Sequence, residues 1–337
     1  MAAGRSLGEV LHGGPVDAEE LARVRDVLLF EGPELGKRVV RFFCLLVLAA
    51  AIATFGLLGD SVAAVIGAMI VAPLMLPIMG LAFGVSIGER SAIVSSVLVG
   101  LGGITASILV GLALTFPLAQ LVHVETIGQV MARTSPRLID LLAALATGLA
   151  GAFAIGRKDV SDTLPGVAIA ISLVPPLANV GILLAAGRPE LALGSLLLFV
   201  TNYFAILLTG ALVFGLMRYP DAALAGRTSK ARRRAIVLAI AMLVIVGVPL
   251  TYTSAGIVSS NVTKSRVNEA ASEWLQGTTY RVASIETEHE GEVDLVIIGE
   301  GDPPHVPDLE TALRGRLFGR MLRLEVLPTS EYLLETR

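Results

Sequence analysis

The polar residues that could do chemistry lie beside two apolar segments that contain prolines. Pro73 and Pro77 are one helical turn apart in the first segment, and Pro175 and Pro176 are adjacent in the second. A proline in a helix offers no N–H to the carbonyl four residues earlier, and in hydrocarbon that carbonyl needs another partner. The two segments therefore predict free carbonyl oxygens, which favour a cation or a small neutral solute over an anion.

Polar side chains near these prolines complete the predicted site. Asn179 is the polar residue placed most deeply beside an interrupted segment; it either binds the solute or forms a hydrogen bond between helices. Ser172, Asn202 and Tyr203 are weaker candidates for the site. Structural roles are more frequent for such residues; a serine in lipid, for example, usually bonds its own backbone. The predicted substrate-binding set comprises these four residues and the prolines Pro73, Pro77, Pro175 and Pro176.

Two acidic residues, Asp60 and Asp159, lie at the edges of apolar segments. Their positions predict helix N-caps or first-turn acids, and an ion gate is the alternative. No ionisable residue falls in the middle of a predicted span, which argues against a proton-coupled carrier with an intramembrane carboxylate. The four histidines are scattered and Cys44 is the single cysteine. We therefore expect no catalytic constellation, no metal site and no cofactor.

The composition predicts a polytopic membrane protein. Of the 337 residues 54% are hydrophobic and 16% are charged, and the mean hydropathy is +0.75. An N-terminal segment, residues 1–38, contains an amphipathic helix at 16–30 with Asp17 as its N-cap. Seven blocks are long enough to cross a bilayer, at about residues 39–59, 61–85, 91–118, 138–156, 165–186, 191–217 and 235–257.

An internal repeat relates the first six spans. A shift of 99 positions aligns Gly67 with Gly166, Pro77 with Pro176 and Gly88 with Gly187, and it continues without a gap through Ser96 with Ser195 and Gly111 with Gly210. Each copy, residues 39–118 and 138–217, contains three spans, so the second copy enters the membrane in the opposite sense. Inverted repeats of this kind occur in secondary transporters, whose sites lie near the midplane between interrupted helices.

Basic residues near the span ends predict the orientation. Most of these basic residues lie on one side of the membrane, whereas the short loops on the other side carry only Arg133, Arg137 and Arg188. The first side, which includes the N-terminus, is therefore predicted to be cytoplasmic. Seven crossings place the residues after 257 outside; a re-entrant segment would place them inside. A basic cluster before the seventh span is a topology signal that could also bind anionic lipid, through Arg227, Lys230, Arg232, Arg233 and Arg234.

The C-terminal tail, residues 258–337, differs in composition from the rest. A helix at 265–275, strands at 281–285 and 293–298, a helix at 308–318 and a strand at 323–327 predict a small soluble α/β domain of ββαβ order. A unit of this size often needs a partner or an oligomer for stability. The fold expected for the whole chain is thus an all-α polytopic membrane domain, with a 3+3 inverted repeat and a seventh helix, followed by this tail.

Three motifs resemble one prokaryotic family. They are GAMIVAPLM at 67–75, ARTSPRLID at 132–140 and LPGVAIAISLVPPLA at 164–178. All three are similar to the membrane proteins grouped as domain-of-unknown-function family 389, and the similarity covers about residues 39–217. The resemblance implies a bacterial or archaeal polytopic membrane protein, and it supplies neither an activity nor functional residues.

Two functions remain open at this stage. The first is a non-enzymatic transporter or channel-like protein of the cytoplasmic membrane, a homo-oligomer, with its site at the crossing of the second and fifth spans. The second is a membrane-anchored sensor or scaffold whose tail binds a ligand or a partner. The first predicts a solvated cavity between the interrupted helices, and the second predicts a dry, tightly packed midplane. Nothing in the charge distribution indicates nucleic-acid binding.

Overall fold

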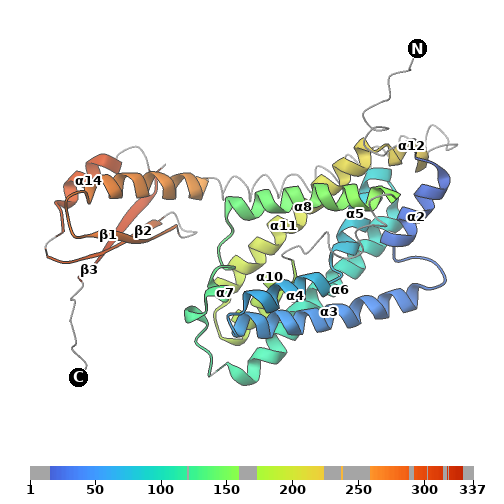
Figure 1. Cartoon of the computed structure of the whole chain (residues 1–337), viewed down its shortest axis with the longest axis horizontal. Coiled ribbons are helices and arrows are strands. Elements are labelled where there is room, and N and C mark those ends of the chain that lie inside the picture. Colours follow the sequence, from blue (N-terminus) through green and yellow to red (C-terminus); the bar gives the residue numbers. More distant parts are fainter. Residues whose placement is uncertain are drawn as a thin grey trace, which may run out of the picture. The chain divides into compact units, whose positions relative to one another are not determined.

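The computed structural model consists of two compact units, Met1–Ser254 and Ala255–Arg337, each with its own hydrophobic core (Figure 1). The residues that it describes are 16–119, 121–158, 173–223, 237, 259–287, 292–301, 303–313, 317 and 319–328. The first unit is helical throughout and the second combines helices with a small sheet, so the predicted change of fold class along the chain is found.

The helical unit begins with an amphipathic helix. Asp17 caps it, accepting from the backbone N–H of Glu20 at 2.8 Å, as predicted. Helices then follow in the order α2 (Ala18–Leu28), α3 (Leu35–Leu58), α4 (Val62–Val71), α5 (Met75–Ile87) and α6 (Arg90–Thr115). After two short 3-10 turns (Phe116–Leu118, Val124–Thr126) come α7 (Gly128–Met131), α8 (Leu138–Gly156), α10 (Val174–Ala185), α11 (Pro189–Leu216) and α12 (Tyr219–Ala223).

The first proline segment is a broken helix. Helices α4 and α5 are bent by 48° at a break between Val71 and Met75, where Pro73 has no N–H to continue α4. The predicted free carbonyl of Pro73 is not found, because it accepts from the N–H of Leu76 at 3.0 Å. Pro77 is the third residue of α5, in the first turn, where a backbone N–H has no partner within the helix. It therefore starts a helix instead of interrupting one.

The second proline segment behaves in the same way where it is described. Pro175 and Pro176 are the second and third residues of α10, again within a first turn. The carbonyls of Ile171 and Ser172, which the sequence predicts to be free, lie outside the described residues. Neither pair of prolines thus interrupts the interior of a helix that the structure describes.

The two long helices α6 and α11 connect the halves of the unit. Helix α5 packs against both of them, and so does α10. Two glycines allow the close approach: Gly111 of α6 leaves no room for a Cβ beside the carbonyl of Ala178 in α10, and a Cβ on Gly210 of α11 would lie 3.0 Å from Sδ of Met79 in α5. The first half thus contacts the second through two similar crossings.

The ends of α5 and α10 also resemble each other. Gly88 and Gly187 follow these helices with left-handed φ values of 65° and 72°, a conformation that glycine adopts without steric cost. The next residue closes the turn in both places, since Glu89 N donates to Gly84 O at 3.0 Å and Arg188 N donates to Leu183 O at 2.8 Å.

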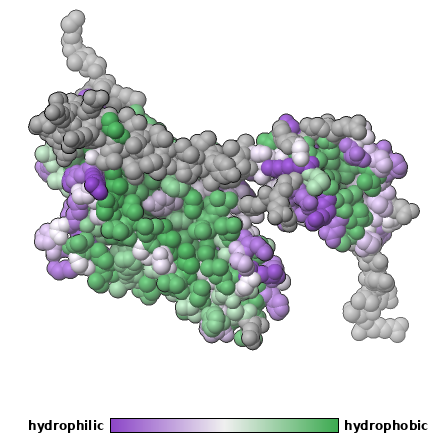
Figure 2. Space-filling model, turned by 180° about the vertical axis from the view of Figure 1, so that it is seen from behind, coloured by the Kyte–Doolittle hydropathy of each residue, from purple (hydrophilic) through white to green (hydrophobic). Residues whose placement is uncertain are grey.

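The outer surface of the helical unit is apolar. Large side chains such as Leu98 (65% exposed) and Leu193 (61% exposed) point away from the core, and Figure 2 shows hydrophobic residues over this surface with hydrophilic residues gathered towards its ends. Among the described residues, α3, α6 with the turn that follows it, α8 and α11 are long and apolar enough to cross a membrane, and the bent pair α4–α5 makes a fifth candidate. These features are typical of a membrane protein.

The other predicted spans are only partly covered. Of the fifth predicted span the structure describes residues 173–186, which form α10 and its C-terminal turn, and of the seventh it describes residue 237 alone. The number of crossings therefore stays a prediction. The basic cluster at 227–234 also lies outside the described residues.

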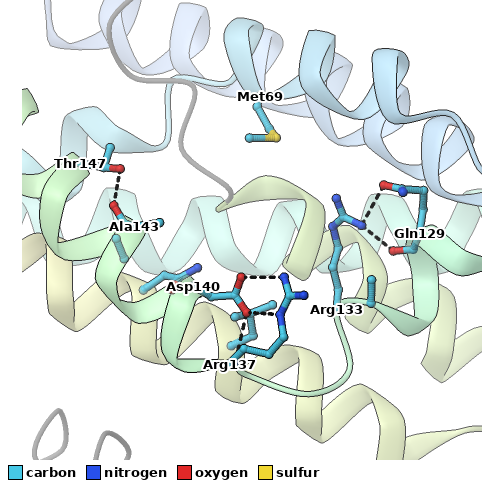
Figure 3. A pocket seen from close by; sticks show the side chains of 11 residues that line it. Met69, Gln129, Arg133, Arg137, Asp140, Ala143 and Thr147 are labelled. Carbon is cyan, nitrogen blue, oxygen red and sulfur yellow. Dashed lines mark hydrogen bonds and ion pairs between the residues drawn. The ribbon is translucent and has the colours of Figure 1, made fainter. Parts of the chain in front are cut away.

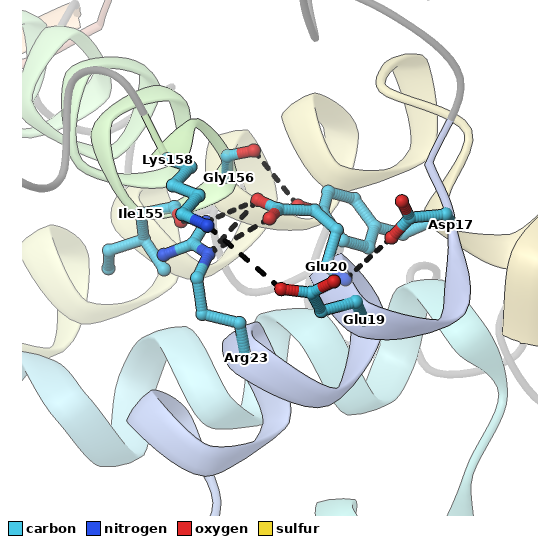
Figure 4. Close-up of polar contacts among 8 residues, drawn as sticks. Asp17, Glu19, Glu20, Arg23, Ile155, Gly156 and Lys158 are labelled. Atoms are coloured by element: carbon cyan, nitrogen blue, oxygen red, sulfur yellow. Dashed lines mark hydrogen bonds and ion pairs between the residues drawn. The ribbon is translucent and has the colours of Figure 1, made fainter.

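Helix α2 is held to the helical unit by polar contacts (Figure 4). Arg23 donates through Nη2 to the carbonyl of Ile155 at 2.8 Å, near the end of α8, and forms an ion pair with Glu20. The hydroxyl of Tyr219 donates to the neighbouring carbonyl of Gly156 at 2.9 Å. These bonds satisfy carbonyls that a helix C-terminus leaves without partners.

The C-terminal unit contains a three-stranded sheet. Residues 259–274 are helical, followed by β1 (Arg281–Thr287), β2 (Glu292–Gly299), α14 (Val306–Leu313) and β3 (Met321–Pro328). Strand β2 is central, antiparallel to β1 and parallel to β3, and α14 lies in the crossover that parallel pairing requires. Alternate residues of β2, including Val293, Leu295 and Ile297, are buried. The predicted strand–strand–helix–strand order is thus found.

Candidate functional site

A cavity of about 320 Å³ lies between α4, α7, α8 and α11 (Figure 3). Its apolar wall consists of Met69, Ala132, Ala143, Ala144 and Leu198. Its polar wall consists of Gln129, Arg133, Arg137, Asp140, Thr147 and Asn202. Small-molecule sites combine apolar walls with convergent polar groups; this cavity has more polar lining residues than is typical of them, and its volume is at the lower end of their range.

The charged groups of the cavity carry one net positive charge. Arg137 and Asp140 form an ion pair at the start of α8, with Nε and Nη2 donating to the two carboxylate oxygens at 3.1 Å each. Hydrogen bonding to Asp140 raises the pKa of Arg137. The two charges cancel, which leaves that of Arg133. A guanidinium is protonated in proteins at any ordinary pH, so the excess charge is permanent.

Arg133 forms no ion pair in the described part of the chain, although the carboxylate of Asp140 attracts it electrostatically. Its Nη1 donates to the carbonyl of Gln129 at 2.5 Å and to Oε1 of the same residue at 3.1 Å. Its Nε–H is buried and has no acceptor among the described residues. Burial lowers the pKa of Arg133, because desolvation disfavours the charged form. The cavity therefore contains a cation whose hydrogen-bonding capacity is only partly used.

A hydrogen-bond network fixes the backbone that carries Arg133. The amide of Asn179 on α10 donates to the carbonyl of Val130 at 3.0 Å and to Oγ of Ser195 at 2.7 Å. Ser195, on α11, donates in turn to the carbonyl of Arg133 at 2.7 Å. Asn179 is fully buried. It thus connects two helices to the segment between α7 and α8, which is the structural role that the sequence left open for it.

Asp60 supports the same segment from the other side. Its Oδ1 accepts from the backbone N–H of Gln129 at 2.7 Å, at the start of α7. Its φ is 49°, in the left-handed region that aspartate tolerates better than most residues. The N-cap of α4 is Ser61, whose Oγ accepts from Ala64 N at 3.4 Å. Asp60 therefore caps a short helix that lies far from it in the sequence.

The structure brings few of the predicted site residues together. Asn202 is buried and lines the cavity. Tyr203 packs against the rings of Phe199 and Phe204. The cavity lining does not include Asn179 or the prolines Pro73, Pro77, Pro175 and Pro176. Ser172 and Asp159 lie outside the described residues.

The sequence interpretation missed the charged part of the cavity. Arg133 and Arg137 entered it only as basic residues of a short loop, although both lie in the motif at 132–140 that carries the family resemblance. Its combination of two arginines and an aspartate within eight residues was the available signal. Within the described ranges, no three His, Cys, Asp or Glu side chains come together as a metal site would require.

Comparison with known proteins confirms the resemblance. Residues 69–208 match the model of the family described as Domain of unknown function (DUF389), a region that includes every residue lining the cavity. A curated relative is an uncharacterized protein of the archaeon Methanocaldococcus jannaschii, which is 29% identical over 171 residues. The match covers 50% of this chain and 52% of the relative, so it spans about half the length of each protein.

Proposed function

We propose that this chain is a non-enzymatic transporter or channel-like protein of the cytoplasmic membrane, and that its solute site is the cavity around Arg133. The observation that carries the proposal is the position of the cavity between the two halves of the helical unit. Met69 comes from α4 of the first half, just before the break at Pro73. Gln129, Ala132, Arg133 and Arg137 come from the segment that connects the halves, and the remaining lining residues come from α8 and α11 of the second half. Solute sites of secondary transporters lie at such interfaces, beside discontinuous helices.

The proposed architecture is a 3+3 inverted repeat with a seventh helix. The contacts across the halves support it, because they are reciprocal under the 99-residue shift. Gly111 meets Ala178, and their counterparts Gly210 and Met79 meet each other. A two-fold relationship produces such exchange, in which residue i contacts j of the other half and j contacts i. The matching left-handed turns at Gly88 and Gly187 support the same register.

The distribution of charged residues supports the proposed orientation. Arg25 pairs with Glu89 and Lys158 with Glu19, so residues near three predicted cytoplasmic ends lie together. Arg188 pairs with Glu125, in the loop region that also contains Arg133. In this orientation the N-terminus is cytoplasmic, the cavity lies towards the outer side, and seven crossings place the C-terminal unit outside. Anionic lipid at the basic cluster of residues 227–234 and a homo-oligomeric state complete the proposal.

The solute that fits best is neutral or anionic. The cation that the sequence favoured depended on carbonyls freed by proline, and the carbonyl of Pro73 is occupied by Leu76 N. The cavity wall carries an excess positive charge instead, which disfavours a cation in a partly desolvated site. Asn202 and Thr147 can bond to a polar solute of either remaining kind.

The sensor or scaffold is the second candidate. The observation in its favour is that the C-terminal unit has a hydrophobic core of its own, which contains Val267, Tyr280, Leu295 and Leu309. A domain of this kind can bind a ligand or partner independently of the membrane part. A flux experiment separates the two functions, since a scaffold has no need of an open cavity.

Filling the cavity tests the transport function. Ala143 and Ala146 are both exposed on the same helix, but only Ala143 lines the cavity. In proteoliposomes, Ala143→Phe should abolish the flux of small neutral and anionic solutes, and Ala146→Phe should leave it unchanged. Equal flux through both variants and the wild type, or no flux of any solute through the wild type, would refute transport through this cavity.

A further inference from the structure

We infer that the cavity binds an oxyanion, a carboxylate or phosphate group of its ligand, through the free edge of the Arg133 guanidinium. The inference deepens the proposed function and rests on it only for the fate of the ligand after binding. The site itself follows from the hydrogen-bond geometry, the charge and the shape of the cavity.

Arg133 lines the cavity, and its buried Nε–H has no acceptor among the described residues. Nη1 is engaged twice by Gln129, and no bond within the described residues engages Nε, which is buried. Nε–H and the N–H of Nη2 that is on the same side form the fork that matches two oxygens of a carboxylate or phosphate. Gln129 thus holds the side chain through Nη1, and the Nε–H on the opposite edge is left without an acceptor among the described residues.

The charge balance favours an anion at this edge. Asp140 is the one carboxylate in the cavity lining, and both of its oxygens are bonded to Arg137. A partly buried cation without a counter-ion is unfavourable because desolvation is not repaid. An oxyanion would repay it through a charge-assisted pair of hydrogen bonds, which are stronger than those between neutral groups. Neutral solutes offer no equivalent compensation.

The backbone of Arg133 is held in place. Ser195 on α11 donates to the carbonyl of Arg133, and Asn179 on α10 donates to the carbonyl of Val130. Two helices thus fix the segment that carries Arg133. A ligand that binds Arg133 would therefore contact the connecting segment through the fixed arginine, the first half through Met69 and the second half through Leu198 or Asn202. Binding would connect the two halves at their interface, where the solute sites of secondary transporters lie.

The apolar wall limits the rest of the ligand. Met69, Ala144 and Leu198 lie on it, and the volume of about 320 Å³ allows a short apolar or weakly polar body beside the oxyanion. The same chemistry could come from a free solute or from a lipid headgroup phosphate. The experiment below therefore includes membranes with and without anionic lipid.

Direct binding tests the site without reliance on flux. The full-length protein is placed in nanodiscs of phosphatidylcholine, and binding of radiolabelled acetate and inorganic phosphate is measured. The wild type should bind at least one of them. Arg133→Gln should weaken that binding roughly 10- to 100-fold, as expected for the loss of charge-assisted bonds, and Arg133→Lys should retain part of it because it keeps the charge and loses the fork.

The matched control is Arg188→Gln, which removes the same charge from an exposed arginine paired with Glu125. It should bind like the wild type. Folding of every variant is checked by its thermal midpoint without ligand, and Arg133→Gln should be no less stable than the wild type because it removes an uncompensated charge. Absence of wild-type binding to both probes, or equal losses in Arg133→Gln and Arg188→Gln, would overturn the inference.

Two further arms separate the outcomes. If phosphatidylglycerol in the nanodisc displaces acetate or phosphate from the wild type and from Arg188→Gln alike, the oxyanion is a lipid headgroup, and the site at Arg133 stands. If the probes bind through Arg133 but no solute crosses proteoliposomes, transport fails and the oxyanion site stands. If a neutral solute crosses and Arg133→Gln leaves its flux and all binding unchanged, transport stands and the oxyanion inference fails.

Discussion

The amide of Asn179 donates to the hydroxyl of Ser195 at 2.7 Å, and their counterparts under the 99-residue shift, Gly80 and Ser96, are also neighbours. A Cβ on Gly80 would lie 2.7 Å from Oγ of Ser96 and 2.9 Å from the carbonyl of Leu28, at the end of α2. In both halves a short apolar helix (α5 or α10), the long helix that follows it and a short helix that precedes it therefore meet at one point. In the second half alone a side-chain amide joins them, and there it positions Arg133.

The Asn179–Ser195 bond should be worth measurable stability. Each of Asn179→Ala and Ser195→Ala should lower the free energy of unfolding by about 0.5–2 kcal/mol, typical of polar contacts between helices in membranes. Because both residues belong to one network, a double-mutant cycle should give a coupling energy clearly different from zero. Ser86→Ala serves as the control, since Ser86 bonds within its own helix to Phe83 O. Strict additivity would show that the bond does not form.

The close crossing of α6 and α10 should not tolerate a methyl group. A Cβ on Gly111 would collide with the backbone of Ala178, whereas a Cβ on Gly210 would meet the flexible thioether of Met79 at 3.0 Å. Gly111→Ala should therefore lower the thermal midpoint strongly and Gly210→Ala less. Gly215→Ala has open space around it and should be neutral or stabilising. An equal effect of all three substitutions would contradict the reciprocal contact.

Asp60 should contribute as a cap of α7. Asp60→Ala loses both the bond to Gln129 N and a residue that tolerates φ near 49°, so it should cost about 1–2 kcal/mol of stability. Asp60→Asn keeps an acceptor and tolerates the same backbone conformation, and it should cost less than half of that. The two variants are compared by chemical unfolding in detergent. An equal loss in Asp60→Asn and Asp60→Ala would contradict the cap and indicate that the charge itself matters, as in an ion gate.

Tyr219 should make stability depend on alkaline pH. Burial raises the pKa of its hydroxyl above the ordinary value of 10, since desolvation disfavours the phenolate. A group whose pKa is raised by folding contributes stability below the unfolded-state pKa and loses it as the pH rises through the folded-state pKa. Unfolding measured from pH 8 to 11 should therefore show a steeper loss of stability above pH 10 in the wild type than in Tyr219→Phe. Parallel curves would contradict this interpretation.

Local features could be predicted from the sequence because they depend on neighbouring residues. The cap at Asp17, the apolar helices and the strand–strand–helix–strand tail each follow from spacing and residue type. The role of the prolines could not, because it depends on where the helix begins. In the middle of a helix Pro77 would leave a carbonyl without a partner, whereas in the first turn it starts a helix. The break at Pro73 puts Pro77 in the first turn of α5.

The site could not be predicted for a related reason. Arg133 is positioned by Ser195, 62 residues away, and its segment by Asn179, 49 residues from Val130. Nothing in a linear sequence indicates that these groups meet. Asn202 was predicted from its place on an apolar helix, and the structure puts it in the cavity; the arginine that gives the cavity its charge was recognised only once the helices were packed.

Aqueous access to the cavity is the most direct test of the account. In a Cys44→Ala background, which removes the single native cysteine, Ala143→Cys and Ala146→Cys are compared in nanodiscs with a membrane-impermeant, charged thiol reagent. Thiolate is the reactive form and forms in water, not in lipid. The account predicts rapid modification at position 143, slowed by an oxyanion that occupies Arg133, and little at 146. No reaction at 143, or equal rates at both positions, would contradict a solvated solute site at this interface.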